Sequence, residues 1–421
     1  MAGLVALDYL IIVVFFVLVI YFSYLLKQVT GSTKMFFLAG RSLPGWLAGL
    51  TFITGNVSEM EILGLTGGGY VFGLVMAQYD WVGAIPAIVF LSLVLVPYYY
   101  KNRIYNLLEF TGLRYGDTTR LFHSILMLSY MLLALGTGLY VFALALNVML
   151  GLPIWIGVIV TALILGVITA SGGLSSMVLV QFLAFAITWF TLVPISLLAL
   201  NEVGGWTGLV NGLQPEMLTV WRSASDPFMP WTATILGLGF ALSFASWSTD
   251  SAIMHNVLAA RSPRDARMAP LIGGLVKLAV PFITVIPGMA AAVLIPGLAK
   301  PDTAIFELIL RYYPTGLAGL GFLSIMGAFA AMNTGVIMGS SNIFMQNIYR
   351  RVIKKGASEA HYLRASRATT VLIMFLGILT AFIAAQFTVV YIWIQEYNAA
   401  IIVPLLGILL LGLFWRRMTT I

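Results

Sequence analysis

Ionisable side chains fall inside long apolar stretches of this sequence, where a charge is costly to bury. They are Glu59, Glu61, Asp80, Asp250, Lys277 and Glu396. At the centre of a bilayer each costs about 2.5 to 3.5 kcal/mol to insert, so residues of this kind are usually kept to bind or move an ion or a solute. A buried carboxylate can also take up a proton, and for this role Glu59, Glu61, Asp80 and Asp250 are the candidates.

Two questions about these charges stay open. Lys277 either neutralises a carboxylate in a buried pair or contacts a solute or gate. The carboxylates either exchange a proton or bind a cationic, amine-bearing solute whose charge compensates for their burial. The three histidines, His123, His255 and His361, share no ligand spacing, and we expect them at solvated or interfacial positions.

Eleven apolar stretches of helical length place these charges in a membrane. The first, residues 7–26, has about the 20 residues that an α-helix needs to cross a hydrocarbon core. The others are residues 45–71, 74–98, 122–150, 153–170, 177–200, 231–257, 269–296, 316–347, 368–386 and 389–414. The sequence therefore predicts an all-α integral membrane protein with about 11 transmembrane helices, in which residues 1–421 form one transmembrane domain.

Basic residues orient the chain, since 18 of its 22 lysines and arginines fall in alternate gaps between the spans. By the positive-inside rule those gaps are cytoplasmic, which puts the N-terminus outside and the C-terminus in the cytoplasm of a multi-pass cell-membrane protein. The net charge of +7 is then expected to face lipid headgroups of the bilayer and not nucleic acid. Oligomeric state cannot be read from these apolar surfaces.

Composition also excludes several classes of function. Hydrophobic residues make up 61% of the chain and mean hydropathy is +1.00, too apolar for a soluble fold. The absence of cysteine rules out thiolate metal sites and cysteine nucleophiles. Phosphate-binding loops, paired metal-binding histidines and serine nucleophile elbows are absent as well, so we expect neither an enzyme nor a cofactor, a bound sodium ion excepted.

The spans divide into two blocks of five. A polar connection over residues 201–230 separates residues 45–200 from residues 231–414, and the span 7–26 precedes both. Because five is odd, the second block starts on the opposite side of the membrane, as in inverted-topology repeats. The first span of each block contains residues that weaken a helix, at 55–58 and 67–69 in one and at 246–250 in the other. Paired interruptions of this kind predict a midplane binding site, although the glycines at 67–69 could instead serve close packing.

Short motifs along nearly the whole chain resemble those of the sodium/solute symporters, which include carriers of sugar, proline and sialic acid. The motifs are FLAGRSLP at 37–44, NVS at 56–58, SGGLSS at 171–176, LAARS at 258–262, IQEY at 394–397 and GLFWRR at 412–417. The resemblance implies a leucine-transporter-like fold with a 5+5 inverted repeat and one preceding helix. It also implies the positions that face the solute in the sugar carriers: Glu61, Asp80, Ser243, Ser246, Trp247, Lys277 and Gln395.

The sodium site implied by the resemblance departs from the family pattern. It would use the backbone carbonyls of Thr54, Val57 and Ala328 together with two hydroxyl side chains, but those two positions are Ala331 and Met332. An aspartate of some relatives, associated with a further sodium site, is Gln181 here. Since sodium is a hard cation that prefers several oxygen ligands, the sequence predicts a degenerate sodium site and coupling that is proton-driven or absent.

The predicted function is therefore secondary transport of a small polar solute by alternating access. A transporter-fold sensor that reports a solute to a signalling partner is the alternative, and the end of the chain just after residue 414 fits either a minimal carrier or a detached sensor domain. The identity of the solute cannot be predicted, because Glu61 stands where a neutral side chain is usual and Gly83 lacks bulk.

Asp250 generates a first test, because it abuts the predicted interruption of the span 231–257. If its carboxylate carries the coupling proton, Asp250→Asn should abolish the pH dependence of solute uptake, since an amide cannot exchange a proton in this range. The measurement is uptake across a pH series, and unchanged pH dependence in the variant would remove Asp250 from the mechanism.

Overall fold

The computed structural model describes residues 5–26, 32–102, 107–150, 152–249, 251–314, 316–386, 390–415 and 417. Over these residues it is helical, with two isolated β-bridges and no strand. Among the described helices, eight are long and apolar enough to cross a membrane. The fold class predicted from the sequence, an all-α membrane protein, is confirmed.

Each of the eleven expected spans falls on helices of the described part. Two helices precede the first block, α1 (Ala6–Leu26) and α2 (Thr33–Leu38). The first block contains α3 (Gly45–Thr54), α4 (Glu59–Phe72), α5 (Gln78–Trp81), α6 (Ile85–Phe90), α7 (Val96–Lys101), α8 (Leu107–Tyr115), α9 (Asp117–Leu150), α10 (Ile154–Gly172) and α11 (Leu174–Glu202). The connection contains α12 (Gly205–Gly212), and the second block contains α13 (Trp231–Ala233), α14 (Ser243–Thr249), α15 (Ser251–Leu258), α16 (Pro263–Ile283), α17 (Val285–Leu294), α18 (Ala304–Tyr312), α19 (Ala318–Ile343), α20 (Glu359–Ala384) and α21 (Val390–Phe414). Short 3₁₀ or π segments connect several of them, notably η6 (Thr234–Leu242) and η8 (Phe344–Ile353).

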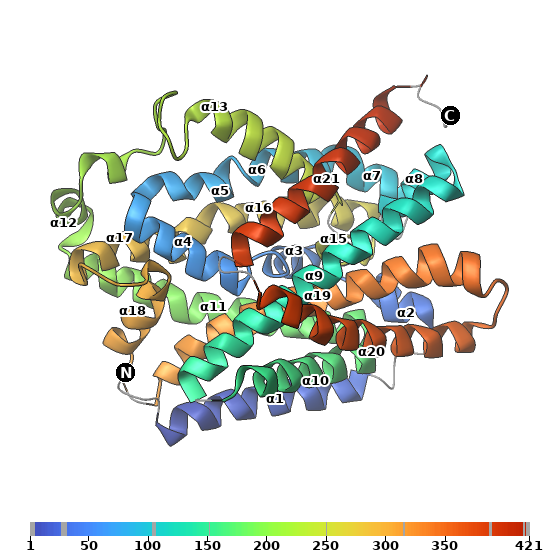
Figure 1. Ribbon diagram of the computed structural model, residues 1–421, viewed down its shortest axis with the longest axis horizontal. Helices are drawn as coiled ribbons and strands as arrows, with labels where there is room; N and C mark the ends of the chain where they lie inside the picture. Colours follow the sequence, from blue (N-terminus) through green and yellow to red (C-terminus); the bar gives the residue numbers. More distant parts are fainter. Residues whose placement is uncertain are drawn as a thin grey trace.

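Long helices surround a buried centre. In Figure 1, α12 and α18 lie toward one end of the long axis and α2 and α8 toward the other, α9 and α21 cross the view obliquely, and α1 and α10 lie side by side along one edge. The helix α19 is buried along most of its length, whereas α1 exposes apolar side chains such as Leu10, Val13 and Val17. An apolar outer face is what a protein in lipid requires, because the hydrocarbon solvates it.

The first span of block one is broken where the sequence predicts, between α3 and α4. Ser58 begins α4 as its N-cap, and its hydroxyl accepts the backbone N–H of Glu61 at 3.2 Å. A serine followed three residues later by glutamate is the sequence signature of a helix start. The second predicted interruption, at residues 67–69, is wrong, since these glycines lie inside the continuous helix α4. A Cβ at Gly69 would lie 2.5 Å from the Val285 carbonyl oxygen, so Gly69 allows α4 to pack against α17, while Gly67 and Gly68 allow the close approach of Asp302 and Met76.

The first span of block two starts as α13, passes through the π segment η6 and continues as α14 up to Thr249, and α15 follows from Ser251. Of the interruption predicted at residues 246–250, residues 246–249 lie inside the helix α14. Residue 250 lies outside the described residues, so the expectations placed on Asp250 stay predictions.

A short backbone bridge ties the first spans of the two blocks together at one end. Leu43, just before α3, pairs with Ala260, just after α15. The N–H of Leu43 donates to the Ala259 carbonyl at 3.1 Å, and the N–H of Arg261 donates to the Leu43 carbonyl at 2.8 Å. The Tyr100 hydroxyl adds a third bond, to the Ala260 carbonyl. The start of α3 and the end of α15 are therefore held to each other by main-chain hydrogen bonds.

The helix α1 docks through one buried carboxylate. Asp8 is fully buried, and it accepts the N–H groups of Gly319 at 2.7 Å and of Gly316 at 3.3 Å, at the N-terminus of α19. Negative charge is favourable there because the helix N-terminus carries partial positive charge and unpaired N–H groups. A side chain at Gly319 would collide with the Asp8 backbone, so glycine permits this approach.

Removing this carboxylate should loosen α1. Hydrogen bonds to a charged group are each worth about 1.5 to 3 kcal/mol, so we expect Asp8→Ala to lower the apparent melting temperature of the purified protein in detergent. Glu216→Gln, at an exposed loop position, is the control and should melt like the unmodified protein. An unchanged melting temperature in Asp8→Ala would contradict the docking role.

Candidate functional site

The buried ammonium of Lys277 is the centre of the candidate site. Its Nζ lies 2.5 Å from Glu61 Oε1 and 2.8 Å from Asp80 Oδ1, and it donates to Asn56 Oδ1 at 3.0 Å. Because an ammonium has three donors, these three acceptors satisfy it completely. The Lys277 side chain is only 3% exposed, whereas that of Glu61 is 17% exposed. The site is therefore a closed charge cluster, partly accessible on the Glu61 side.

Four segments supply this cluster. Lys277 projects from α16, and Asp80 from the one-turn helix α5. Glu61 lies in the first turn of α4, positioned by the Ser58 cap, and Asn56 lies in the break between α3 and α4. The ion pair thus joins both sides of the helix break to α5 and α16. Asn56 belongs to the interruption predicted at residues 55–58 and to a family motif, but it was not among the predicted site residues, and its polar side chain inside a helix interruption is the signal that marks it.

Two further predicted residues lie against the cluster. The Lys277 Nζ is 6.0 Å from the centroid of the Trp247 ring, within reach of a cation–π interaction. Trp247 Nε1 donates to the Gly83 carbonyl at 3.1 Å, and the Ser243 hydroxyl donates to the same oxygen at 2.6 Å. Gly83 follows α5, so α14 is fastened beside the segment that carries Asp80. The structure thus brings Glu61, Asp80, Lys277 and Trp247 together, with Ser243 one contact away.

Other predicted residues are not placed in this cluster. Glu59 is buried at the start of α4, and its Oε2 accepts no hydrogen bond from the described residues. Ser246 is half-buried on α14. The side chains of Gln395 and Glu396 and the whole of Asp250 lie outside what the structure describes. Asp80 retains one oxygen, Oδ2, that is buried and unpaired among the described residues.

The expected sodium positions lie at the end of α3 and on α19. Thr54 ends α3, and Val57 lies in the break that follows it. On α19, Ala328 and Ala331 are buried and Met332 is half-buried, and none of the three carries a side-chain oxygen. The Ala331 carbonyl accepts bonds from the Thr334 hydroxyl at 3.0 Å and from Gln181 Nε2 at 3.3 Å.

A buried polar seam that the sequence did not predict runs beside these positions. Gln181 on α11 accepts a hydrogen bond from Asn256 Nδ2 on α15 at 3.0 Å. Its neighbour His255 is fully buried and lies 3.3 Å from Asn342 Nδ2. The expectation of interfacial histidines is therefore wrong for His255, and also for His123, which is buried on α9. Single polar residues in apolar spans gave no periodic signal for this seam.

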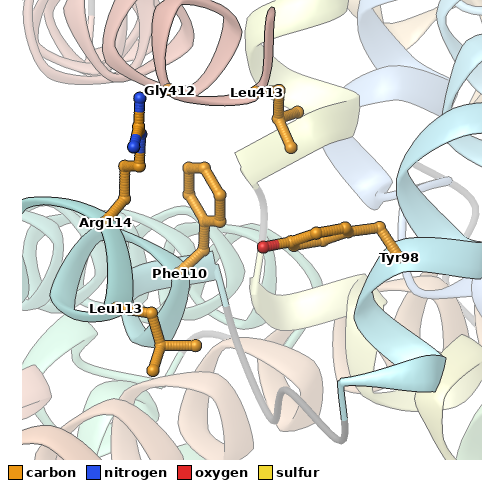
Figure 2. Close-up of a pocket in the computed structure, with 6 residues that line it drawn as sticks. All are labelled: Tyr98, Phe110, Leu113, Arg114, Gly412 and Leu413. Carbon is orange, nitrogen blue, oxygen red and sulfur yellow. The ribbon is translucent and has the colours of Figure 1, made fainter. Parts of the chain in front are cut away.

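A separate cavity of about 300 Å³ lies at the end of the molecule where α7, α8 and α21 meet. Figure 2 shows Phe110, Leu113 and Arg114 of α8 across from Tyr98 of α7 and Leu413 of α21. Arg114 Nη2 donates to the Trp415 carbonyl, which helps to fasten the end of α21. Since this cavity contains none of the predicted site residues, it is not part of the Lys277 cluster.

Solved structures of transporters share this fold. A Na⁺-coupled sialic acid symporter, solved in a substrate-bound outward-open state, has a TM-score of 0.86 over 98% of this chain and 88% of its own, at 18% identity. Mhp1, a nucleobase-cation-symport-1 family transporter, has a TM-score of 0.62 over 90% of this chain and 79% of its own, at 16% identity. These are leucine-transporter-fold proteins, so the fold implied by the sequence resemblance is confirmed.

Sequence comparisons agree with the fold. A sodium/glucose cotransporter of Vibrio parahaemolyticus is 26% identical over 94% of this chain and 77% of its own. An uncharacterized symporter of Escherichia coli, YidK, is 27% identical over 93% of this chain and 71% of its own. The model of the sodium:solute symporter family matches residues 36–421. Its relatives are transporters and not enzymes, and the chain belongs to the sodium:solute symporter family.

Proposed function

We propose that this protein is a secondary transporter that moves a small polar solute through the membrane by alternating access, with its solute site at the Lys277 cluster. The observation that carries the proposal is the position of the cluster. It joins the break between α3 and α4 to α5 and α16, and a broken membrane-spanning helix of this kind in a transporter supplies the midplane binding site. Ser243, Ser246, Trp247 and Gln395 are proposed to complete it.

The charge of the cluster limits what the site can accept. One ammonium faces two carboxylates, so the ionised cluster has one negative charge in excess. All three donors of Lys277 are used, whereas Asp80 Oδ2 is an acceptor without a partner among the described residues. A proton, or a cationic or amine-bearing solute, would neutralise the excess charge. An acceptor-rich site of this kind favours a solute that donates hydrogen bonds.

The proposed coupling differs from ordinary sodium symport. The positions Thr54, Val57, Ala328, Ala331 and Met332 form a degenerate sodium site, because Ala331 and Met332 have no side-chain oxygen. We propose that coupling is proton-driven, through Glu59, Glu61 or Asp250, or absent. The most basic gaps are proposed to be cytoplasmic, with the N-terminus outside.

Solute exchange tests the transport function directly. Proteoliposomes preloaded with an unlabelled solute should accumulate the labelled solute by counterflow, because an alternating-access carrier exchanges across the membrane without an ion gradient. Glucose and sialic acid are the first probes, since relatives are named for them. Glucosamine is the matched probe for glucose, because it replaces one hydroxyl with an ammonium.

Two controls separate the outcomes. Glu61→Gln removes the excess negative charge, so it should reduce the preference for glucosamine over glucose, whereas Glu307→Gln on α18 should not. A probe that raises the melting temperature but shows no counterflow would support the alternative, a membrane sensor that reports its solute to a signalling partner.

Lys277 provides a second test, on stability. Removing one partner of a buried ion pair costs about 3 to 5 kcal/mol, because the remaining charge is left uncompensated. We therefore expect Lys277→Met to lower the apparent melting temperature strongly, and expect the triple variant Lys277→Met, Glu61→Gln, Asp80→Asn to recover much of the loss. Lys300→Met, at an exposed position, is the control. A stable single variant would mean that the cluster is not the buried, balanced unit described here.

A further inference from the structure

The side chain of Gln181 lies where four helical segments meet. It projects from the first half of α11 and is fully buried. Its amide nitrogen lies close to Gly55, the C-cap of α3, since a Cβ at Gly55 would be only 2.6 Å from Gln181 Nε2. The same nitrogen bonds to α19, and the amide oxygen bonds to α15. Gln181 therefore contacts the first spans of both blocks, at α3 and α15, and the buried helix α19.

The orientation of the amide is fixed by its partners. A backbone carbonyl can only accept, so the group that faces the Ala331 oxygen must be the NH₂ of Gln181. The oxygen of Gln181 then faces Asn256 and accepts from its Nδ2 at 3.0 Å. A flipped amide would set two oxygens against each other at Ala331 and two NH₂ groups at Asn256. The hydrogen-bond network therefore allows one orientation.

This arrangement opposes a cation at the same place. The NH₂ group carries partial positive charge, and it occupies the Ala331 carbonyl beside the end of α3. The Thr334 hydroxyl donates to the same Ala331 carbonyl at 3.0 Å, so two donors already face this oxygen. A hard cation needs several converging oxygens, whereas this position presents a donor.

We propose that Gln181 is a built-in latch that joins the end of α3 to α15 and α19 by an amide, in place of a link that depends on a bound cation. The latch rests on the proposed function, since it concerns how the carrier holds the first spans of its two blocks together. Its consequence is that the described arrangement is held without sodium. Gln181 is thus a positioning residue for the transport cycle.

The test is the melting temperature of purified protein in matched sodium chloride and choline chloride. The unmodified protein should melt at the same temperature in both salts. Gln181→Asp replaces the donor with a carboxylate facing the Ala331 carbonyl, so it should melt lower in choline and show a saturable rise with sodium. A structural role alone would not create this sodium response.

Two further variants keep the test decisive. Gln181→Met keeps the approximate length without the amide, and it should melt lower equally in both salts. Thr188→Val removes another hydrogen bond between α11 and α19, from the Thr188 hydroxyl to the Ser324 carbonyl at 3.2 Å, and it should show no sodium response. If Gln181→Asp fails to fold, the unmodified protein and Gln181→Met decide the question.

Two results would overturn the latch. One is a sodium-specific, saturable rise in the unmodified protein, and the other is a Gln181→Met variant as stable as the unmodified protein. Solute counterflow is measured separately, so a sodium-responsive protein that still exchanges solute would reject the latch and keep the transport proposal.

Discussion

The protonated Lys277 side chain is the interaction on which the centre of the molecule depends. Three acceptors from three segments converge on one ammonium, in surroundings where an unpaired charge would be strongly unfavourable. The chain can interrupt its first core span only because other groups replace the hydrogen bonds that an intact helix would have made. The Ser58 cap satisfies the start of α4, and Lys277 holds Asn56 and Glu61 on either side of that cap. The hydrogen bonds and ion pairs of Lys277 therefore neutralise the buried charges and also hold the two sides of the helix break.

Close packing supplies the rest of the framework. In lipid, apolar surface alone does not bring helices together, so contact area and hydrogen bonds must do so. Glycines at the α4–α17 and α1–α19 contacts let backbones approach, and buried polar side chains such as Asp8 fix particular pairs of helices. Gln181 belongs to the same class of contact, but it lies where the first spans of both blocks meet.

Much of this fold could be predicted from the sequence, because the bilayer imposes strong periodic constraints on length and charge. The eleven spans, the break at residues 55–58 and the buried charges at Glu61, Asp80 and Lys277 all follow from apolar runs and their exceptions. The break predicted at the glycines 67–69 is wrong. Glycine weakens an isolated helix but also permits a close helix crossing, and the sequence alone does not show which neighbour, such as α17, packs against it. The seam of Gln181, Asn256 and His255 could not be predicted, because its partners come from different spans and single polar residues have no period.

The bridge between Leu43 and Ala260 has a mechanical consequence. It joins the start of α3 in the first block to the end of α15 in the second, through main-chain bonds that do not depend on side-chain identity. The Tyr100 hydroxyl of α7 bonds to the Ala260 carbonyl, which the two main-chain bonds leave free, and those two bonds oppose the separation of α3 from α15 at this end. A tilt of one of these helices is therefore expected to carry the other with it.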